Sequence, residues 1–502
     1  MALSPRKSGV LLHISSLMGE YGIGTFGKNA RRFVDFLAES GFHLWQVLPF
    51  TGIDSCNSPY KSDSAFAGNE LFLDPETLRA QGLLTDAECA DCRGTVDYAV
   101  DFDRVRATRA RMLDRIWAKA RLRPDTGAKL ARFRAESPEI ADYALYRALK
   151  ERFGCEWPDW PDEALRMHEP EAVARAEREC ADAVNRVLFA QLQFAEQWAD
   201  TRAYANARGI EMIGDIPFYL ALESADVWAN RALFELDERG RPTRVAGVPP
   251  DYFSETGQKW GNPLYRWERM RTDGFAWWRR RLRHTLTLFD RVRIDHFRAF
   301  SAYWAVPADA ETAQDGRWKP GVGMDFFRAM DGLLTPENGI AEDLGVQDRA
   351  LTQLLADCGL PGIRVLQFGF LGDGDDMNLP HRYRENTVAY SGTHDNNTLL
   401  AYLWELTPEQ RARCLRYCGF TGEDWQSGGA ENPAIRAVLR TLWSSHAKIV
   451  VAPIQDLCGF GRDTRMNQPG IAERNWTFRL TESAFASIDR AYLRELNALY
   501  CR

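Results

Sequence analysis

Residues 291-RVRID-295 form a short strand-like run that ends in a carboxylate, and this pattern decides the predicted fold. Short apolar runs of this kind are typical of strands that are buried on both faces of a parallel sheet. Eight candidate runs recur along the chain: Val10–Ile14, Leu44–Leu48, Ile210–Ile213, Val292–Ile294, Gly339–Ala341, Ile363–Phe368, Thr387–Tyr390 and Ile449–Ala452.

Helical patterns lie between most of these runs. They cover Asn29–Glu39, Ala190–Ala207, Phe275–Leu288, Phe326–Met330, Arg349–Cys358 and Pro433–His446. Strands that alternate with helices predict a parallel sheet. Eight such strands predict an α/β fold, a closed (β/α)₈ TIM barrel with large insertions between its strands.

The uneven spacing of the runs locates the insertions. We expect residues 1–502 to form a single catalytic barrel. The interval of about 70–188 is charged and Ala-rich, as in Glu169–Glu179, and predicts a mainly helical insertion. The interval of about 217–270 is rich in Pro, Gly and aromatic residues, and predicts a loop-rich insertion over the active-site cleft.

The bulk composition is that of an ordinary globular protein. The chain has 502 residues, of which 45% are hydrophobic and 26% charged. Its net charge of -7 argues against a nucleic-acid or anionic-membrane partner, because both favour a basic surface. The basic cluster Arg279–His284 is interpreted as the solvated face of a helix. No apolar stretch approaches a membrane span or a secretory signal, so we expect a cytoplasmic protein.

Metal and cofactor signals are weak. The ten cysteines lack the dense spacing of a disulfide scaffold, and Cys89 and Cys92 form a single C-x-x-C without a second pair at zinc-site spacing. The role of these two cysteines stays open. The histidines include no H-E-x-x-H, and no serine has a G-x-S-x-G context. These patterns argue against a metal site and against a serine hydrolase.

The stretch Gly22–Gly27 is a literal G-x-G-x-x-G and has two interpretations. A dinucleotide-binding turn follows its strand almost at once, and an acid ends the next strand. Here Ser15–Tyr21 intervene, and Leu44–Leu48 is followed by Pro-Phe-Thr-Gly rather than by an acid. We therefore favour a long first βα loop of the barrel, which we expect to border the active-site mouth and to hold no phosphate.

Four acids follow or end predicted strands: Asp215, Asp295, Glu342 and Asp395. In a parallel barrel the chemistry lies at the C-terminal ends of the strands. A single acid at such a position is often only a helix cap, but four acids around one mouth favour a catalytic site.

The neighbours of these acids suggest different roles. Arg293 and Asp295 lie two apart in an extended strand, so both side chains leave the same face, and a guanidinium favours the ionised form of a nucleophilic carboxylate. Glu342 would share the mouth with other acids, which raises a carboxyl pKa and suits a general acid. This pair can cleave a glycosidic bond with retention, and Asp395 could stabilise the transition state.

At these residues the chain resembles the 4-α-glucanotransferases, also called amylomaltases or disproportionating enzymes, of glycoside hydrolase family 77 in the α-amylase clan. The stretches 293-RIDHFR-298, 340-IAEDLG-345 and 392-GTHDN-396 are similar to the three active-site motifs of that family. Further matches are 8-SGVLLHISSL-17, 45-WQVLP-49, 58-SPY-60, 64-SAFAGN-69, 248-VPPDYFSETGQKWGNPLYRW-267 and 465-RMNQPG-470.

The resemblance implies transfer of an α-1,4-glucan segment to the 4-hydroxyl of another glucan or of glucose. Maltooligosaccharides and starch-like glucans would be the partners, and no metal or cofactor would take part. By this matching Asp295 is the nucleophile, Glu342 the acid and base, and Asp395 the stabiliser. The implied substrate-binding residues are Ser58, Tyr60, Asp215, Asp251, Gln258, Trp260, Arg293, His394 and Asn467.

Two details of the resemblance stay open. The loop Pro249–Trp260 is a candidate lid, and any of Asp373, Asp375 or Asp376 could be an acidic substrate contact. Three other functions also stay open: an α-amylase-type retaining hydrolase, an NAD-dependent oxidoreductase built on Gly22–Gly27, and a non-catalytic carbohydrate-binding protein. Chain-length preference, cyclic products and oligomeric state are not fixed by the sequence.

Overall fold

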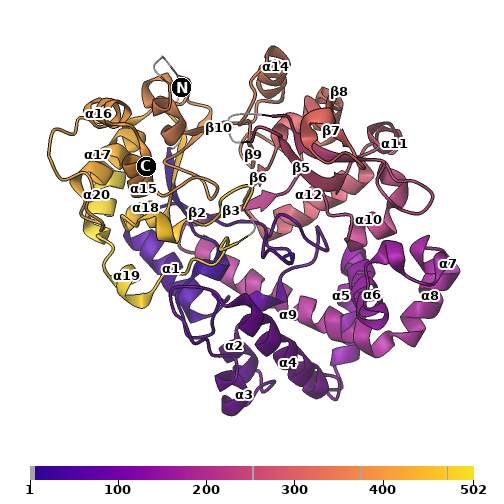
Figure 1. The fold of residues 1–502 in the computed structure, drawn as a ribbon. Coiled ribbons are helices and arrows are strands. Elements are labelled where there is room, and N and C mark those ends of the chain that lie inside the picture. Colours follow the sequence, from indigo (N-terminus) through magenta and orange to yellow (C-terminus); the bar gives the residue numbers. More distant parts are fainter. Residues whose placement is uncertain (1–5, 251–253, 373–375, 472) are drawn as a thin grey trace.

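A computed structural model describes residues 6–250, 254–372, 376–471 and 473–502. Eight parallel strands within these ranges close into a barrel in the order β1-β12-β11-β10-β9-β6-β3-β2 (Figure 1). Each predicted run overlaps one of them, so the (β/α)₈ prediction is confirmed. The strands are β1 (Lys7–Leu11), β2 (Leu44–Gln46), β3 (Glu211–Ile216), β6 (Arg291–Ile294), β9 (Gly339–Ala341), β10 (Gly362–Val365), β11 (Thr387–Tyr390) and β12 (Ile449–Pro453).

The register of the barrel aligns the strand ends that carry acids. Asp215 of β3 pairs with Arg293 of β6, and Ile294 of β6 pairs with Ala341 of β9. The strands are buried almost throughout because helices cover the barrel outside and side chains fill it inside. Asp295 and Glu342, the residues after β6 and β9, therefore emerge side by side at one rim.

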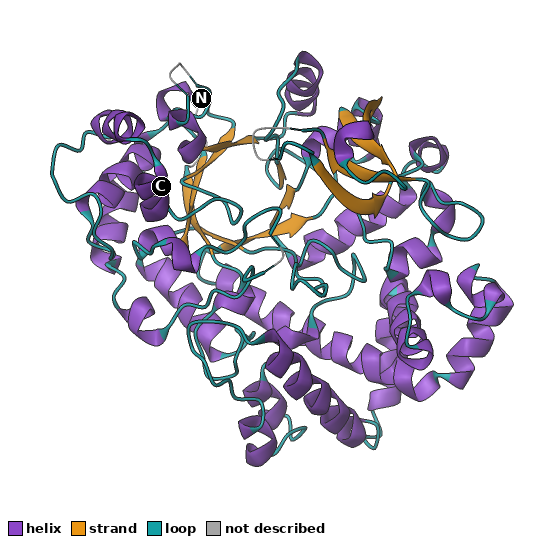
Figure 2. Ribbon diagram, in the orientation of Figure 1, coloured by secondary structure: helices purple, strands orange, loops and turns teal. Residues whose placement is uncertain are grey.

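Helices surround the barrel (Figure 2). In α1, Ala30, Phe33, Val34 and Leu37 recur at helical spacing and are all buried. The predicted helices are present, although α9 begins at Ala181 rather than Ala190. These and the C-terminal helices are α1 (Lys28–Glu39), α9 (Ala181–Asn206), α12 (Ala276–Leu288), α13 (Met324–Ala329), α14 (Arg349–Cys358), α15 (Leu399–Glu405), α16 (Pro408–Tyr417), α17 (Pro433–Ser444), α18 (Ile454–Leu457), α19 (Glu482–Ala486) and α20 (Arg490–Leu499).

Helices also fill the long interval between β2 and β3, and they gather below the barrel in Figure 1. Of these helices, α4, α5, α6 and α8 pack on α9, which leads back to β3. The assignment of one catalytic barrel domain with two insertions remains a prediction. The helices are α2 (Pro75–Ala80), α3 (Asp86–Ala90), α4 (Phe102–Ala120), α5 (Thr126–Glu136), α6 (Pro138–Phe153), α7 (Glu163–Arg166) and α8 (Pro170–Glu179).

The interval of about 217–270 also contains short regular elements between its loops. Besides α10 (Ala225–Ala229) and α11 (Trp267–Thr272) it holds two strands of an antiparallel sheet with the order β5-β4-β7-β8. Two of its strands come from the chain after β6, so the pairing joins segments that no local pattern connects. The four strands are β4 (Arg244–Val248), β5 (Gln258–Pro263), β7 (Ala302–Pro307) and β8 (Arg317–Pro320).

The glycines of Gly22–Gly27 build a packed loop. Gly22 has a φ of +75°, and a Cβ there would lie 3.2 Å from the Gly94 Cα. A Cβ on Gly24 would lie 1.7 Å from the Ile14 carbonyl oxygen. Gly27 is the N-cap of α1 and faces Asp74. These contacts run to the preceding segment and the helical insertion, so the glycines serve close packing there, and the expected border with a sugar site is not among them.

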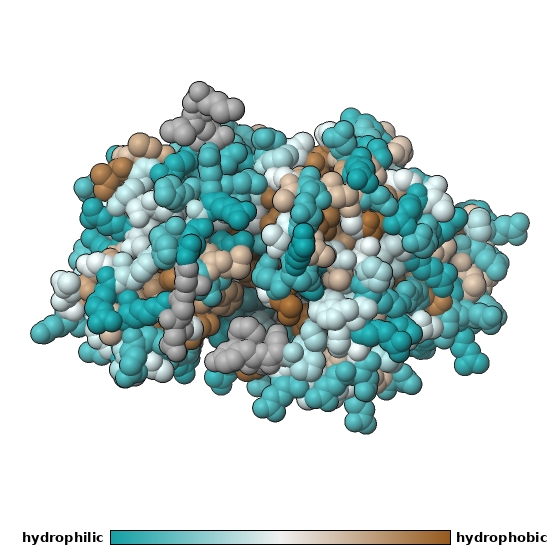
Figure 3. Space-filling model, turned by 90° about the horizontal axis from the view of Figure 1, so that it is seen from above, coloured by the Kyte–Doolittle hydropathy of each residue, from teal (hydrophilic) through white to brown (hydrophobic). Residues whose placement is uncertain are grey.

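The molecular surface is mainly hydrophilic, and apolar side chains gather around a central hollow in the view of Figure 3. No helix in the described ranges combines the length and apolar character that crossing a membrane requires.

Candidate functional site

The predicted catalytic acids emerge from neighbouring strands. The Asp295 N–H donates to the Ile216 carbonyl (3.0 Å), and the Glu342 N–H donates to the Ile294 carbonyl (3.0 Å). The Phe297 N–H in turn donates to the Glu342 carbonyl (3.0 Å). The hydrogen-bond ladder of the barrel therefore continues past the strand ends and fixes the backbone of both acids.

Arg293 is the central cation of the site. One of its Nη atoms lies 2.8 Å from the Asp215 carboxylate and 2.9 Å from the Asp295 carboxylate. The Arg293 side chain is only 5% exposed and that of Asp215 is fully buried, whereas the Asp295 side chain is 28% exposed. Asp295 is thus the carboxylate of this cluster that a substrate can reach.

Glu342 lies in a different environment. Its carboxylate accepts the His296 N–H (2.7 Å) and the Leu344 N–H (2.8 Å). His296 has a φ of +49°, an uncommon left-handed conformation that accompanies this donation. Burial raises the pKa of Glu342 to about 8, the nearby Asp295 acts in the same direction, and Arg293 opposes them. A protonated carboxyl near neutral pH is therefore available at the mouth.

Four predicted residues on loops form the other part of the site. The Tyr60 hydroxyl donates to Asp215 Oδ2 (2.7 Å), and its ring stacks on His394 with centroids 5.1 Å apart and planes 14° apart. His394 Nε2 lies 3.4 Å from Asp395 Oδ2. The Asn467 side-chain amide donates to Asp395 Oδ1 (2.6 Å). Burial raises the pKa of Tyr60, which keeps its hydroxyl a donor.

The remaining predicted substrate contacts lie in different parts of the structure, and some fall outside the described residues. Ser58 Oγ accepts the Tyr60 N–H (3.3 Å), so Ser58 supports the Tyr60 turn. Gln258 and Trp260 lie on β5 rather than on a lid loop, and the Trp260 ring is 4.9 Å from the His296 ring. Asp251 lies outside the described residues, as do Asp373 and Asp375, whereas Asp376 Oδ1 accepts the Asn378 backbone N–H.

Two residues with contacts to this site were not predicted to have a role. The Trp476 ring lies 5.8 Å from the ring centroids of both Tyr60 and His394. The Arg465 guanidinium donates to the Asp395 carbonyl (2.5 Å). Arg465 lies within the matched stretch 465–470, but its partner is distant in sequence, so only the folded chain reveals the contact.

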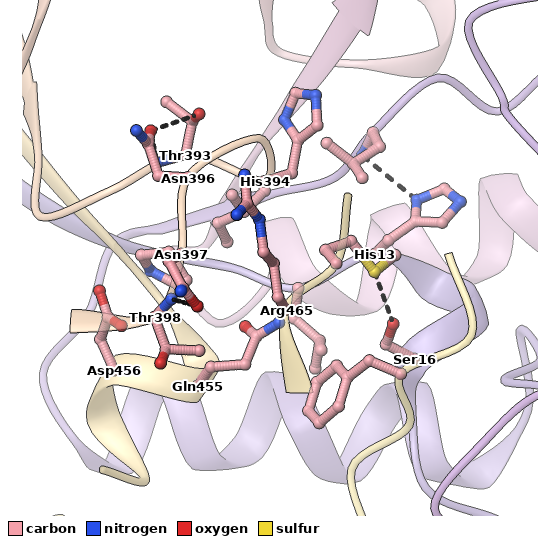
Figure 4. Close-up of a pocket in the computed structure, with 16 residues that line it drawn as sticks. His13, Ser16, Thr393, His394, Asn396, Asn397, Thr398, Gln455, Asp456 and Arg465 are labelled. Atoms are coloured by element: carbon pink, nitrogen blue, oxygen red, sulfur yellow. Dashed lines mark hydrogen bonds between the residues drawn. The ribbon is translucent and has the colours of Figure 1, made fainter. Parts of the chain in front are cut away.

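A pocket adjoins this side of the mouth (Figure 4). Polar side chains line it, and the Arg465 side chain extends through it toward the His394 loop. The Leu48 N–H donates to His13 Nδ1 (3.2 Å), so the proton of neutral His13 lies on Nε2. The polar lining residues are His13, Ser16, Thr393, His394, Asn396, Asn397, Thr398, Gln455, Asp456 and Arg465.

The arrangement suits acid-assisted attack at an electrophilic carbon. Asp295 is an accessible carboxylate opposite a buried cation, and Glu342 is a buried carboxyl with a raised pKa. One ionised and one protonated carboxyl on adjacent strands are the groups that retaining glycoside cleavage requires.

Comparison with known proteins agrees with this chemistry. The family model described as 4-alpha-glucanotransferase matches residues 12–484. The 4-alpha-glucanotransferase of Thermus thermophilus is 41% identical over 98% of each chain, and that of Aquifex aeolicus is 40% identical over 99% of each chain.

A solved structure has the same fold over its whole length. The amylomaltase from Streptococcus agalactiae in complex with acarbose aligns with a TM-score of 0.95 and 36% identity, over 99% of both chains. These matches span the barrel, the helical segment between β2 and β3, and the antiparallel sheet. The chain therefore belongs to the 4-alpha-glucanotransferase family.

Proposed function

We propose that this 4-alpha-glucanotransferase acts on maltooligosaccharides and related α-1,4-glucans through a double displacement at the barrel mouth. A carboxylate oxygen of Asp295 attacks the anomeric carbon of the donor, and the glycosidic bond to the leaving glucan breaks. Glu342 gives its proton to the leaving oxygen. The glycosyl fragment is then held as an ester on Asp295.

The second displacement regenerates the enzyme. The ionised Glu342 takes the proton of an acceptor 4-hydroxyl, whose oxygen attacks the same anomeric carbon and frees Asp295. Asp395 accepts hydrogen bonds from the sugar that strengthen as positive charge grows at the ring. Tyr60, Arg293 and His394 surround this sugar, and Asn467 orients Asp395. These residue roles are the proposal.

The observation that carries this proposal is the contrast between the two strand-end acids. Asp295 faces the Arg293 guanidinium at 2.9 Å and is partly exposed, whereas Glu342 is 9% exposed with its pKa raised by burial. The same pair could serve a hydrolase, so the outcome depends on the acceptor. On β5 the Trp260 ring lies beside the His296 ring, and the Trp260 indole N–H donates to Gln258 Oε1 (3.1 Å). These contacts support binding of an acceptor sugar that excludes water.

Incubation with maltotriose tests the proposed outcome. Transfer produces glucose and longer oligosaccharides while the number of reducing ends stays constant, because each bond broken is replaced by a bond formed. The Asp295→Asn variant is the control for contaminating activity. A steady rise in reducing ends with wild type would instead establish hydrolysis, and sugar binding without turnover would establish a binding protein.

A further inference from the structure

One loop donates hydrogen bonds to the backbone carbonyls of both His394 and Asp395. We define the buttress segment as residues 465–471 and 473–476. The Asn467 N–H donates to the His394 carbonyl (3.0 Å), and Arg465 donates to the carbonyls of Asp395 (2.5 Å) and Asn467 (2.8 Å). The segment therefore fixes the backbone of two predicted site residues.

Trp476 closes the buttress segment in an unusual conformation. Its φ is +67°, in the left-handed region that bulky residues rarely adopt. Such a conformation persists only where surrounding contacts hold it. Its N–H donates to the Met466 carbonyl (2.7 Å), and the adjacent Asn475 amide bridges Gln468 and Ile471.

The Trp476 side chain extends the aromatic stack of the site. Its ring is tilted by 38° to Tyr60 and by 37° to His394, with both centroid distances at 5.8 Å. It is only 5% exposed, so it offers no open face to a sugar. Tyr60 and His394 in turn contact Asp215 and Asp395. The buried Trp476 ring therefore contacts two side chains, Tyr60 and His394, and each of these contacts a carboxylate of the site.

We propose that Trp476 is a positioning residue, which holds the Tyr60–His394 stack in the geometry that the transfer reaction requires. It acts through Tyr60 and His394 and does not touch the substrate. In this proposal the strained left-handed backbone of Trp476 is tolerated because it directs the ring toward the Tyr60–His394 stack. This inference rests on the proposed site, because it assigns Trp476 a task only if Tyr60 and His394 contact the reacting sugar.

The proposal predicts a specific kinetic signature. Misplacement of groups around the reacting centre lowers kcat more than it raises KM, because the lost contacts are strongest in the transition state. We expect Trp476→Leu to lower kcat for maltotriose transfer about 10- to 100-fold, in the range known for small displacements in active sites. Trp476→Phe keeps a ring and should restore most of kcat.

The matched control is Trp443→Leu. Trp443 is fully buried on α17, where its indole N–H donates to Asn497 Oδ1 (2.7 Å), and it packs against Phe42. Loss of this ring should lower Tm without changing kcat of the folded enzyme. Circular dichroism and thermal melting of every variant give the folded fraction by which kcat is normalised.

Each outcome decides the proposal. The order wild type, Trp476→Phe, Trp476→Leu in falling kcat, with KM changed less than kcat, supports positioning. Normalised kcat equal to wild type in both variants overturns it. If Trp476→Leu does not fold, Trp476→Met, which also lacks a ring, takes its place, and unchanged normalised kcat in that variant overturns the proposal. Absence of transfer by wild type would instead refute the proposed function and is recognised separately.

Discussion

The two sides of the barrel mouth are built differently. The strand side consists of Asp215, Arg293, Asp295 and Glu342, which lie on or directly after β3, β6 and β9. The loop side consists of Tyr60, His394, Asp395 and Asn467, which lie on segments beyond the strands. Backbone ladder bonds fix the strand side, whereas contacts between distant loops fix the loop side.

In the proposed mechanism, the reacting groups lie on the strand side and the groups that position the sugar lie mainly on the loop side. The strand side carries the proposed nucleophile, the acid and the buried cation, which need fixed mutual geometry. The loop side carries the groups that we propose surround the sugar, and the buttress segment donates hydrogen bonds to the His394 and Asp395 carbonyls. Substitutions on the strand side should therefore abolish turnover, and substitutions on the loop side should lower it by degrees.

The largest effect is expected from Asp295→Asn on the strand side. The amide is a poor nucleophile, so kcat should fall on the order of 10⁴-fold or more, as for other enzymes that lose a nucleophile. The control is Asp325→Asn, because Asp325 is exposed and forms surface ion pairs with Arg271 and Arg328. Steady-state transfer rates measure both. Retention of substantial activity by Asp295→Asn would remove Asp295 from the chemistry.

The next largest effect is expected from Glu342→Gln, also on the strand side. Loss of the proton donor and acceptor should lower kcat about 10²- to 10⁴-fold. The same substitution should change the pH dependence of stability. The folded state raises the Glu342 pKa from 4.5 to about 8, so its stabilising contribution is complete below pH 4.5 and is lost as pH rises through 8.

Thermal melting across this pH range checks the stability effect. Wild type should lose Tm relative to Glu342→Gln between pH 5 and pH 9. The reason is that the carboxyl ionises freely in the unfolded chain above pH 4.5, whereas the buried carboxyl of the folded chain stays protonated up to about pH 8. A Tm difference that does not change with pH would show that Glu342 titrates at its ordinary value.

The pH dependence of wild-type activity follows from the same carboxyl. In the proposed mechanism Glu342 must be protonated to assist departure of the leaving glucan, so kcat/KM should fall about tenfold per pH unit above about pH 8. Initial rates of maltotriose transfer between pH 6 and pH 10 give the profile. Constant kcat/KM up to pH 10 would contradict the role of general acid.

The smallest effect is expected from Tyr60→Phe on the loop side. The variant removes the donor to Asp215 Oδ2 but keeps the ring stacked on His394, so kcat should fall about tenfold. Tyr383→Phe is the control, because this buried hydroxyl donates to the Asn378 carbonyl. If Tyr60→Phe were as inactive as Asp295→Asn, the distinction between the two sides would fail.

The sequence predicts the barrel well because its strands are locally encoded. Each of the eight runs is apolar enough to be buried on both faces, and the acids of the strand side are adjacent to these runs. The antiparallel sheet is different. Strand β4 pairs with β5 on one side and with β7 on the other, and β7 follows α11, α12 and the barrel strand β6 in the chain. The Gly- and Pro-containing sequences of β4 and β5 also resemble loops.

The loop side shows the same limit. Tyr60, His394 and Asn467 are suggested by matched motifs, but their partners are fixed only when distant segments meet. Trp476 has no periodic pattern around it, and its left-handed backbone cannot be read from a tryptophan in sequence. The preceding matched motif 465-RMNQPG-470 is the one signal that could have directed attention to its segment.

Trapping of the glycosyl-enzyme tests the central role of Asp295 most directly. An α-maltosyl fluoride donor needs no general acid, because fluoride leaves unprotonated, whereas breakdown of the ester needs the base that Glu342→Gln lacks. Mass spectrometry of this variant after mixing should show one added maltosyl group on the peptide that contains Asp295. An adduct on another residue, or fluoride release at the wild-type rate without any adduct, would contradict the proposed mechanism.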